Sequence, residues 1–215
     1  MTSWAHSPHV TAQACPLRIV LASSNMGKLR EYREMADGTG VDVDLLAHFA
    51  DLPAFDESAP TFAENAVGKA LHYSRFCSEL VLADDSGLVV PALGGAPGVR
   101  SARYAGPGAT DADRYRKLLR EMDSREGDER RARFVCVISV AQRGKASLVV
   151  SDRADGLLTT EPRGDRGFGY DPIFFFPELS RTYAELSAAE KNTYSHRGKA
   201  FRKALKLLTN VTSSL

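Results

Sequence analysis

Short apolar runs alternate along the chain with longer segments in which apolar residues recur every three or four positions. The periodic segments predict helices that begin near residues 28, 61, 110 and 195. Alternating strands and helices indicate an α/β architecture. The short runs predict strands at residues 17–22, 41–46, 80–84, 88–90, 134–141, 147–150 and 173–176.

Capping signals and burial patterns refine this assignment. Thr61 and Glu64 precede an apolar stripe at the spacing of a capping box, which marks a helix start. The segment 134–141 is almost entirely apolar, so we expect it to be a central strand. Residues 91–108 and 162–172 are rich in Gly and Pro and predict long loops, which are often functional.

Two adjacent acids, Asp84 and Asp85, end an apolar run and are followed by Ser86 and Gly87. The pattern predicts a buried strand that delivers both carboxylates to a turn at a sheet edge. Neighbouring carboxylates repel each other, and hard oxygen ligands at a strand end suit Mg²⁺. The alternative is an ordinary Asp-Asp-Ser-Gly turn, whose composition is common in loops.

A polar segment, Ser23-Ser24-Asn25-Met26-Gly27-Lys28, joins the first predicted strand to the first helix. Backbone N–H groups at such a junction bind phosphate. The segment lacks the glycine and the Ser or Thr that a Walker A loop needs at its ends. Lys28 lies in the first helical turn, where the macrodipole disfavours a cation, and this conflict suggests an anionic partner. The alternative is a helix cap with Lys28 in solvent.

Three later features could carry chemistry. Phe168-Gly169-Tyr170-Asp171 places two aromatic rings in a Gly-rich loop, where they stack on a base or anchor the core. Lys191, His196 and Arg197 belong to a basic stretch that is either a solvated helix face or an anion site. Glu64 is explained as a capping residue and Glu57 as an exposed loop acid, but either could reach the Asp84-Asp85 turn as a further Mg²⁺ ligand.

Length and composition bound the function. The 215 residues fit one large domain or two packed lobes, and the net charge of +1 gives no argument for nucleic acid or a membrane surface. Cys15, Cys77 and Cys136 form neither a disulfide framework nor a zinc pattern, which favours a reducing compartment. Residues 1–16 lack the features of a signal peptide and are expected to be a disordered leader before a single two-lobed domain at 17–215.

The order of these motifs resembles the inosine/xanthosine triphosphate pyrophosphatase family in its bacterial form. The resemblance spans roughly residues 18–209 in collinear order and rests on the segments 20–31, 61–66, 83–88, 93–104, 167–174 and 190–198. It implies a two-lobed α/β fold with a long central mixed sheet, flanking helices and an active-site cleft between the lobes. It also implies a cytoplasmic homodimer that hydrolyses ITP, dITP and XTP to the monophosphate and pyrophosphate with Mg²⁺.

Residue roles follow from the resemblance. The segment from Ser23 to Lys28 would hold the triphosphate, with Lys28 stabilising the leaving pyrophosphate. Asp85 would be the proton acceptor and a metal ligand, with Glu57 as a second metal position. Independently of the resemblance, we hypothesise that Asp84 is a further metal ligand. The remaining substrate contacts would be Ser86, Phe168, Gly169, Tyr170, Asp171, Lys191, His196 and Arg197.

Two departures from the family pattern affect loops more than chemistry: Arg166 precedes Gly167 where a second glycine is usual, and residues 152–158 lack an aromatic.

Three other functions stay open. A nucleotide-binding sensor would keep the pocket without hydrolysis, and a phosphotransferase would move phosphate to an acceptor. Nucleic-acid binding through the basic C-terminal helix is the third, and the near-neutral charge argues against it.

Overall fold

The computed structural model describes residues 16–212, so the predicted leader lies almost entirely outside the described residues. A single seven-stranded sheet forms its centre, in the order β2-β1-β3-β4-β5-β6-β7. Strands β1, β2 and β3 are parallel to one another, and every pairing from β3 to β7 is antiparallel. The strands are β1 (Leu17–Leu21), β2 (Val41–Leu45), β3 (Leu80–Val89), β4 (Arg131–Gln142), β5 (Lys145–Leu158), β6 (Phe174–Phe176) and β7 (Arg181–Thr182).

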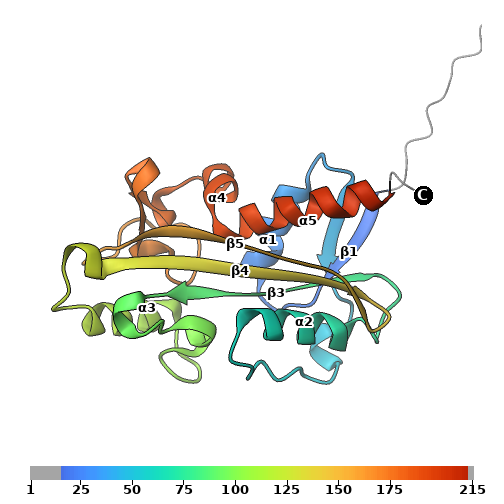
Figure 1. Cartoon of the computed structure of the whole chain (residues 1–215), viewed down its shortest axis with the longest axis horizontal. Coiled ribbons are helices and arrows are strands. Elements are labelled where there is room, and N and C mark those ends of the chain that lie inside the picture. The colour runs from blue at the N-terminus through green and yellow to red at the C-terminus, as the bar shows by residue number, and fades with distance from the viewer. Residues whose placement is uncertain (1–15, 213–215) are drawn as a thin grey trace, which may run out of the picture.

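Helices cover both faces of this sheet (Figure 1). On one face lie α1 (Met26–Ala36), α4 (Ala188–Tyr194) and α5 (His196–Thr212). On the other lie α2 (Phe62–Tyr73) and α3 (Asp111–Glu121). The predicted α/β class with a mixed sheet is therefore confirmed, as are the predicted helix starts. The predicted last helix is preceded by the short helix α4, which opens with a capping box at Ser187.

The strands alternate between two apolar cores. Ile19, Leu21 and Leu82 pack toward α1 and α5, whereas Val20 and Val81 pack toward α2. This alternation follows from the pleat, because successive side chains of a strand point to opposite faces. A third core at the far end of the sheet joins α3 to β4, β5 and β6. The cores around α1, α2 and α5 form one lobe, and the third core forms the other.

The predicted turn at Asp84 and Asp85 is wrong. Strand β3 runs without a break through both acids, and they pair with Ile138 and Val137 of β4. The backbone stays extended because both sides of the acid pair belong to the same ladder with β4. The predicted strands at 80–84 and 88–90 are therefore one element. The predicted hairpin between 134–141 and 147–150 is present, with longer strands than expected.

The ends of the strands open a site in the middle of the sheet. Strand β1 pairs with β3 only as far as Leu21 opposite Leu82. Beyond that point the chain leaves β1 and enters α1, so the next residues of β3 lose their neighbour on this side. Crevices of this kind, beyond the carboxyl ends of parallel strands, are the usual ligand sites of open α/β sheets. Asp84 and Asp85 lie at this opening.

Two expectations about the whole chain concern cysteines and membranes. Cys77 and Cys136 are both free thiols, whereas Cys15 lies outside the described residues. Over residues 16–212, none of the helices has the length and hydrophobicity needed to cross a bilayer.

Candidate active site

A pocket beside β3 gathers most of the side chains that the sequence predicts for the site. It lies between the two lobes, since α1 and α5 contribute one wall and α3 with the 168–171 loop contributes the other. The predicted residues that line it are Asn25, Lys28, Glu57, Asp85, Ser86, Phe168, Gly169, Tyr170, Asp171, Lys191, His196 and Arg197.

The pleat of β3 separates the two adjacent acids. The Asp84 carboxylate points toward α1 and α5, where Oδ1 accepts a hydrogen bond from Lys28 Nζ at 2.9 Å and Oδ2 from Arg197 Nε at 3.4 Å. The Asp85 carboxylate points toward α2, and its Oδ2 accepts from Asn65 Nδ2 at 3.0 Å. The expected repulsion within one site is avoided because successive strand residues face opposite sides.

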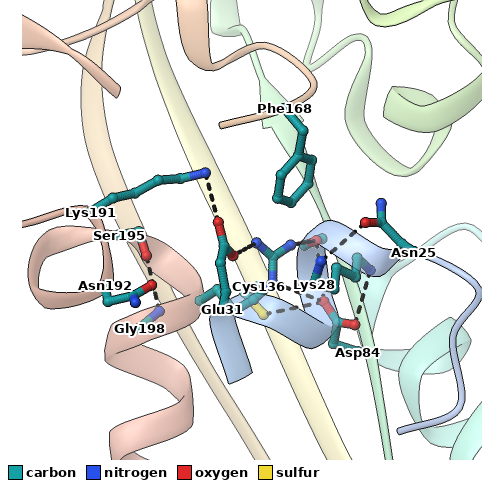
Figure 2. A network of polar contacts seen from close by, with 12 residues as sticks. Asn25, Lys28, Glu31, Asp84, Cys136, Phe168, Lys191, Asn192, Ser195 and Gly198 are labelled. Atoms are coloured by element: carbon teal, nitrogen blue, oxygen red, sulfur yellow. Dashed lines mark hydrogen bonds and ion pairs between the residues drawn. The ribbon is translucent and has the colours of Figure 1, made fainter. Parts of the chain in front are cut away.

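Asp84 is a buried counter-ion. Burial by itself raises the pKa of a carboxyl group, but Lys28 and Arg197 outweigh it and hold the pKa of Asp84 well below its usual range. The Cys136 thiol lies 3.9 Å from Oδ2 (Figure 2). Because its oxygens already face two cations, Asp84 is arranged to fix Lys28 and Arg197 in place. Its predicted role as a metal ligand stays a prediction.

Asp85 has the opposite environment. Burial raises its pKa, and the negative charge of Glu57 adds to the rise, against the lowering effects of Asn65 and Lys28. Glu57 in turn accepts from Lys69 Nζ at 2.7 Å. A carboxylate with a raised pKa in a cleft is suited to take a proton from a nucleophile.

The structure also separates Glu57 from Glu64. Glu57 lines the pocket with Asp85. The Glu64 carboxylate instead accepts from the Thr61 hydroxyl at 2.7 Å, and the Glu64 N–H donates to the same hydroxyl at the start of α2. Glu57 therefore shares the pocket with Asp85, whereas Glu64 does not, and the role of Glu57 as a second metal position stays a prediction.

A charged network at the other end of the pocket centres on Glu31, which the sequence did not identify as a site residue. Its carboxylate binds Lys191 Nζ at 2.7 Å and Arg197 Nη1 at 2.6 Å (Figure 2). Lys191 also contacts Asp171 Oδ2 at 2.5 Å. Burial opposes ionisation of Glu31, but Arg197 and Lys191 lower its pKa overall. The network thus holds two buried cations in fixed positions.

An aromatic ring covers these cations. The Phe168 ring centroid lies 4.6 Å from Lys191 Nζ and 5.4 Å from the guanidinium carbon of Arg197. Figure 2 shows the ring above the charged network. Phe168 is partly exposed, as a stacking surface must be, whereas Tyr170 is buried and donates its hydroxyl to Ser101 O at 2.9 Å. Of the two predicted aromatics, Tyr170 anchors the core and Phe168 faces the pocket.

His196 enters the pocket as a neutral ring. Its imidazole stacks on Phe134 with 4.6 Å between centroids. Burial lowers its pKa far below the usual range, and the charges of Arg197 and Lys191 act in the same direction. Its Nδ1 is buried without a hydrogen-bond partner in the described structure. A neutral ring of this kind offers hydrogen bonds to a ligand without adding charge.

The segment before α1 is folded by its own side chains. Asn25 caps the helix by accepting from Lys28 N–H at 3.1 Å, and Ser23 Oγ accepts from Asn25 N–H at 3.1 Å. Asn25 and Lys28 line the pocket, whereas Ser24 and Met26 are exposed. Substrate contacts of Ser23, Ser24, Met26 and Gly27 stay predictions.

Several residues that line the pocket or bind its side chains were not predicted, although helical spacing carries a signal for some of them. Glu31 follows Lys28 by three positions, and Lys69 follows Asn65 by four, so each pair shares one helix face. Asp111 and Arg114 also line the pocket at a three-residue spacing. What the sequence did not show is which face of each helix turns toward β3.

Fold and site together define an α/β protein whose pocket suits an anionic ligand with a flat ring, because cations and a helix N-terminus adjoin an aromatic face. Residues 19–207 match the model of the Ham1 family. The chain belongs to the Ham1 family, and the resemblance identified from its motifs is confirmed.

Curated relatives and a solved structure agree with this assignment. A dITP/XTP pyrophosphatase of Geobacillus kaustophilus is 51% identical over 185 residues, which cover 86% of this chain and 91% of the relative. A dITP/XTP pyrophosphatase of Desulfotalea psychrophila is 49% identical over 182 residues, covering 85% and 81%. The structure of a HAM1 protein from Coxiella burnetii matches with a TM-score of 0.80 at 41% identity, covering 90% of this chain and 99% of that one.

Proposed function

We propose that this protein hydrolyses the purine nucleoside triphosphates ITP, dITP and XTP to the monophosphate and pyrophosphate. The observation that carries the proposal is the placement of Asp85, whose pKa is raised by burial, in the same pocket as Lys28 and the Phe168 ring. The two curated relatives that are named dITP/XTP pyrophosphatases support the choice of substrates.

In the mechanism, Asp85 takes a proton from the attacking water, because its raised pKa brings it closer to the working pH. Lys28 and the N–H groups at the start of α1 hold the phosphates that leave as pyrophosphate. Asp84 keeps the Lys28 ammonium in position through the 2.9 Å contact. Asp84 is thus a positioning residue, and Asp85 and Lys28 are the catalytic pair.

Magnesium fits the acidic side of the pocket. Burial together with the neighbouring Glu57 charge raises the pKa of Asp85, which marks a site where a cation would be favourable. Mg²⁺ needs few protein carboxylates when substrate phosphates complete its shell, and Asp85 with Glu57 would supply them. When bound, the ion would neutralise phosphate charge and lower the pKa of a water molecule.

Base selectivity is assigned to the cationic end of the pocket. Inosine and xanthine carry an oxygen acceptor at position 6, whereas adenine carries an amino donor. Lys191 and Arg197 are fixed donors there, held by Glu31. An adenine amino group would bring a donor against these cations where a 6-oxo purine brings an acceptor, so adenine would lose that contact. Guanine shares the 6-oxo group, so its exclusion needs a further contact at position 2.

The test is pyrophosphate release from a panel of ITP, dITP, XTP, GTP and ATP, each with and without Mg²⁺. We expect release from the first three substrates and dependence on the ion. Tight binding of ITP without any release would favour a nucleotide sensor instead. Phosphate transfer to an acceptor, with no free pyrophosphate, would favour a phosphotransferase.

We also propose that the protein acts as a cytoplasmic homodimer. The resemblance to the family suggests the dimer, and the free thiols of Cys77 and Cys136 suit a reducing compartment. Light scattering on the purified chain tests the assembly, since a monomer mass at micromolar concentration would contradict it.

A further inference from the structure

The loop that carries Phe168 is tied to helix α3 on one side of the pocket. The N–H of Gly169 donates to Asp111 Oδ2 at 2.7 Å. The neighbouring Tyr170 hydroxyl donates to the Ser101 carbonyl at 2.9 Å. Two consecutive loop residues are therefore fastened to the wall that faces α1 and α5.

The same loop is held at its other end by the opposite wall. The Phe168 N–H donates to Asp171 Oδ2 at 2.8 Å, and that carboxylate is bound by Lys191. The Phe168 ring packs so closely on Gly27 that a Cβ there would come within 2.8 Å of it. The orientation of the ring thus depends on anchors at both ends of the loop.

Asp111 acts through the loop because both of its oxygens are engaged with the protein. Oδ2 holds Gly169, and Oδ1 accepts from the Arg114 guanidinium. Arg114 is fixed in turn by donating from Nη2 to Ala109 O at 2.7 Å. Asp111 and Arg114 therefore hold each other's side chains in place on the first turn of α3.

We propose that Asp111 is a positioning residue that fixes the Phe168 ring against the purine, and so controls substrate affinity and base discrimination. The inference rests on the proposed function. The hydrolytic step lies at Asp85, which Asp111 does not contact through any of the bonds above. Loss of Asp111 should therefore act on KM and on discrimination, and much less on kcat.

The experiment compares pyrophosphate release from XTP and from ATP for four proteins: wild type, Asp111→Ala, Asp111→Asn and Asp113→Ala. A lost hydrogen bond to a charged acceptor corresponds to a rise in KM for XTP on the order of tenfold in Asp111→Ala. We expect its kcat to change by less than about twofold and its preference for XTP over ATP to fall by a similar factor to the KM change.

Two variants separate positioning from helix stability. Asp111→Asn retains a side-chain oxygen for the Gly169 N–H, so its KM should stay near the wild-type value. Asp113 lies in the same helical turn and caps α3 by accepting from Thr110 N–H at 2.9 Å, without contacting the loop. Asp113→Ala should therefore weaken the helix start while leaving KM unchanged.

An unchanged KM in Asp111→Ala would overturn the inference, and so would an equal rise in Asp113→Ala. A fall in kcat without a rise in KM would also contradict it. Failure of the proposed function is a different result, because the wild-type protein itself would then release no pyrophosphate from XTP.

Discussion

The two sides of strand β3 treat adjacent aspartates in opposite ways. On the side of α1 and α5, Asp84 faces Lys28 and Arg197, and its pKa is held well below the usual range despite burial. On the side of α2, Asp85 faces Asn65 and the negative Glu57, and burial raises its pKa. One side stabilises a permanent negative charge, and the other disfavours it.

The difference shows how one strand can present the same residue type as a fixed counter-ion on one face and as a proton acceptor on the other. If both carboxylates faced one side, each would raise the pKa of the other, and neither would be a dependable counter-ion. The pleat prevents this by sending the side chains apart. Groups whose environments push their pKa values in opposite directions indicate which is the structural charge and which takes part in proton transfer.

The largest expected effect on activity is that of Asp85→Asn. An amide cannot accept the proton of the attacking water, so turnover should fall by about 10²–10⁴-fold. The free energy of unfolding should not fall, because the substitution removes a carboxylate whose ionisation is disfavoured by burial. Pyrophosphate release and urea unfolding on the same preparation measure both quantities.

The outcome against this assignment is turnover within a few-fold of wild type in Asp85→Asn. Reduced turnover together with a large loss of stability would also contradict it, since Asp85 would then serve the fold. In either case, the assignment of a structural charge to Asp84 and of proton transfer to Asp85 would be wrong.

The largest expected effect on stability is that of Asp84→Asn. Removing one partner from a buried charge group leaves Lys28 without its counter-ion and leaves Arg197 with Glu31 alone, which typically costs about 3–5 kcal/mol. Turnover should fall as well, because the Lys28 ammonium is no longer held in place. Chemical denaturation of both variants against wild type gives the values.

The effect of the two variants on the free energy of unfolding should depend on pH in opposite directions. Asp84 has a lower pKa in the folded state than in the unfolded state. Its contribution to the free energy of unfolding is therefore present at neutral pH and is lost as the pH falls below the usual range near 4. Asp85 has a higher pKa in the folded state, so its ionisation destabilises the fold increasingly as the pH rises above that range. Parallel stability curves for the two variants would refute the contrast.

The sequence predicted the chemistry of this region better than its geometry. The motifs carried Asp85, Lys28 and the 168–171 loop into one site, and the pocket contains them. The turn at Asp84 was wrong because local composition favours a turn, whereas pairing with β4 on both sides of the acids keeps the chain extended. Glu31 was missed because its role depends on ion pairs with Lys191 and Arg197, which are far from it in the sequence.

A smaller effect, on the pH dependence of kcat/KM, is expected from Glu57→Gln on the Asp85 side of β3. Glu57→Gln removes a negative charge that raises the pKa of Asp85, although burial remains the larger cause. The acid limb of kcat/KM should therefore move to lower pH, whatever the maximal rate of the variant. A pH–rate profile measures the shift, and Glu64→Gln serves as the control, since Glu64 is occupied with Thr61. A limb that stays in place, or moves upward, would exclude the proposed coupling.

The smallest expected effect comes from Glu64→Ala, which tests whether the acidic side of β3 extends to this second glutamate. Its carboxylate accepts from the Thr61 hydroxyl at the start of α2 and does not line the pocket. Turnover and its Mg²⁺ dependence should stay within about twofold of wild type, because only one cap contact is lost. Thr61→Ala is the matched variant and should cost about 1 kcal/mol of stability, the usual value of an N-cap. If Glu64→Ala instead raised the Mg²⁺ concentration needed for half-maximal turnover, Glu64 would belong to the metal side of the site. The division between a capping acid and the pocket acid Glu57 would then be lost.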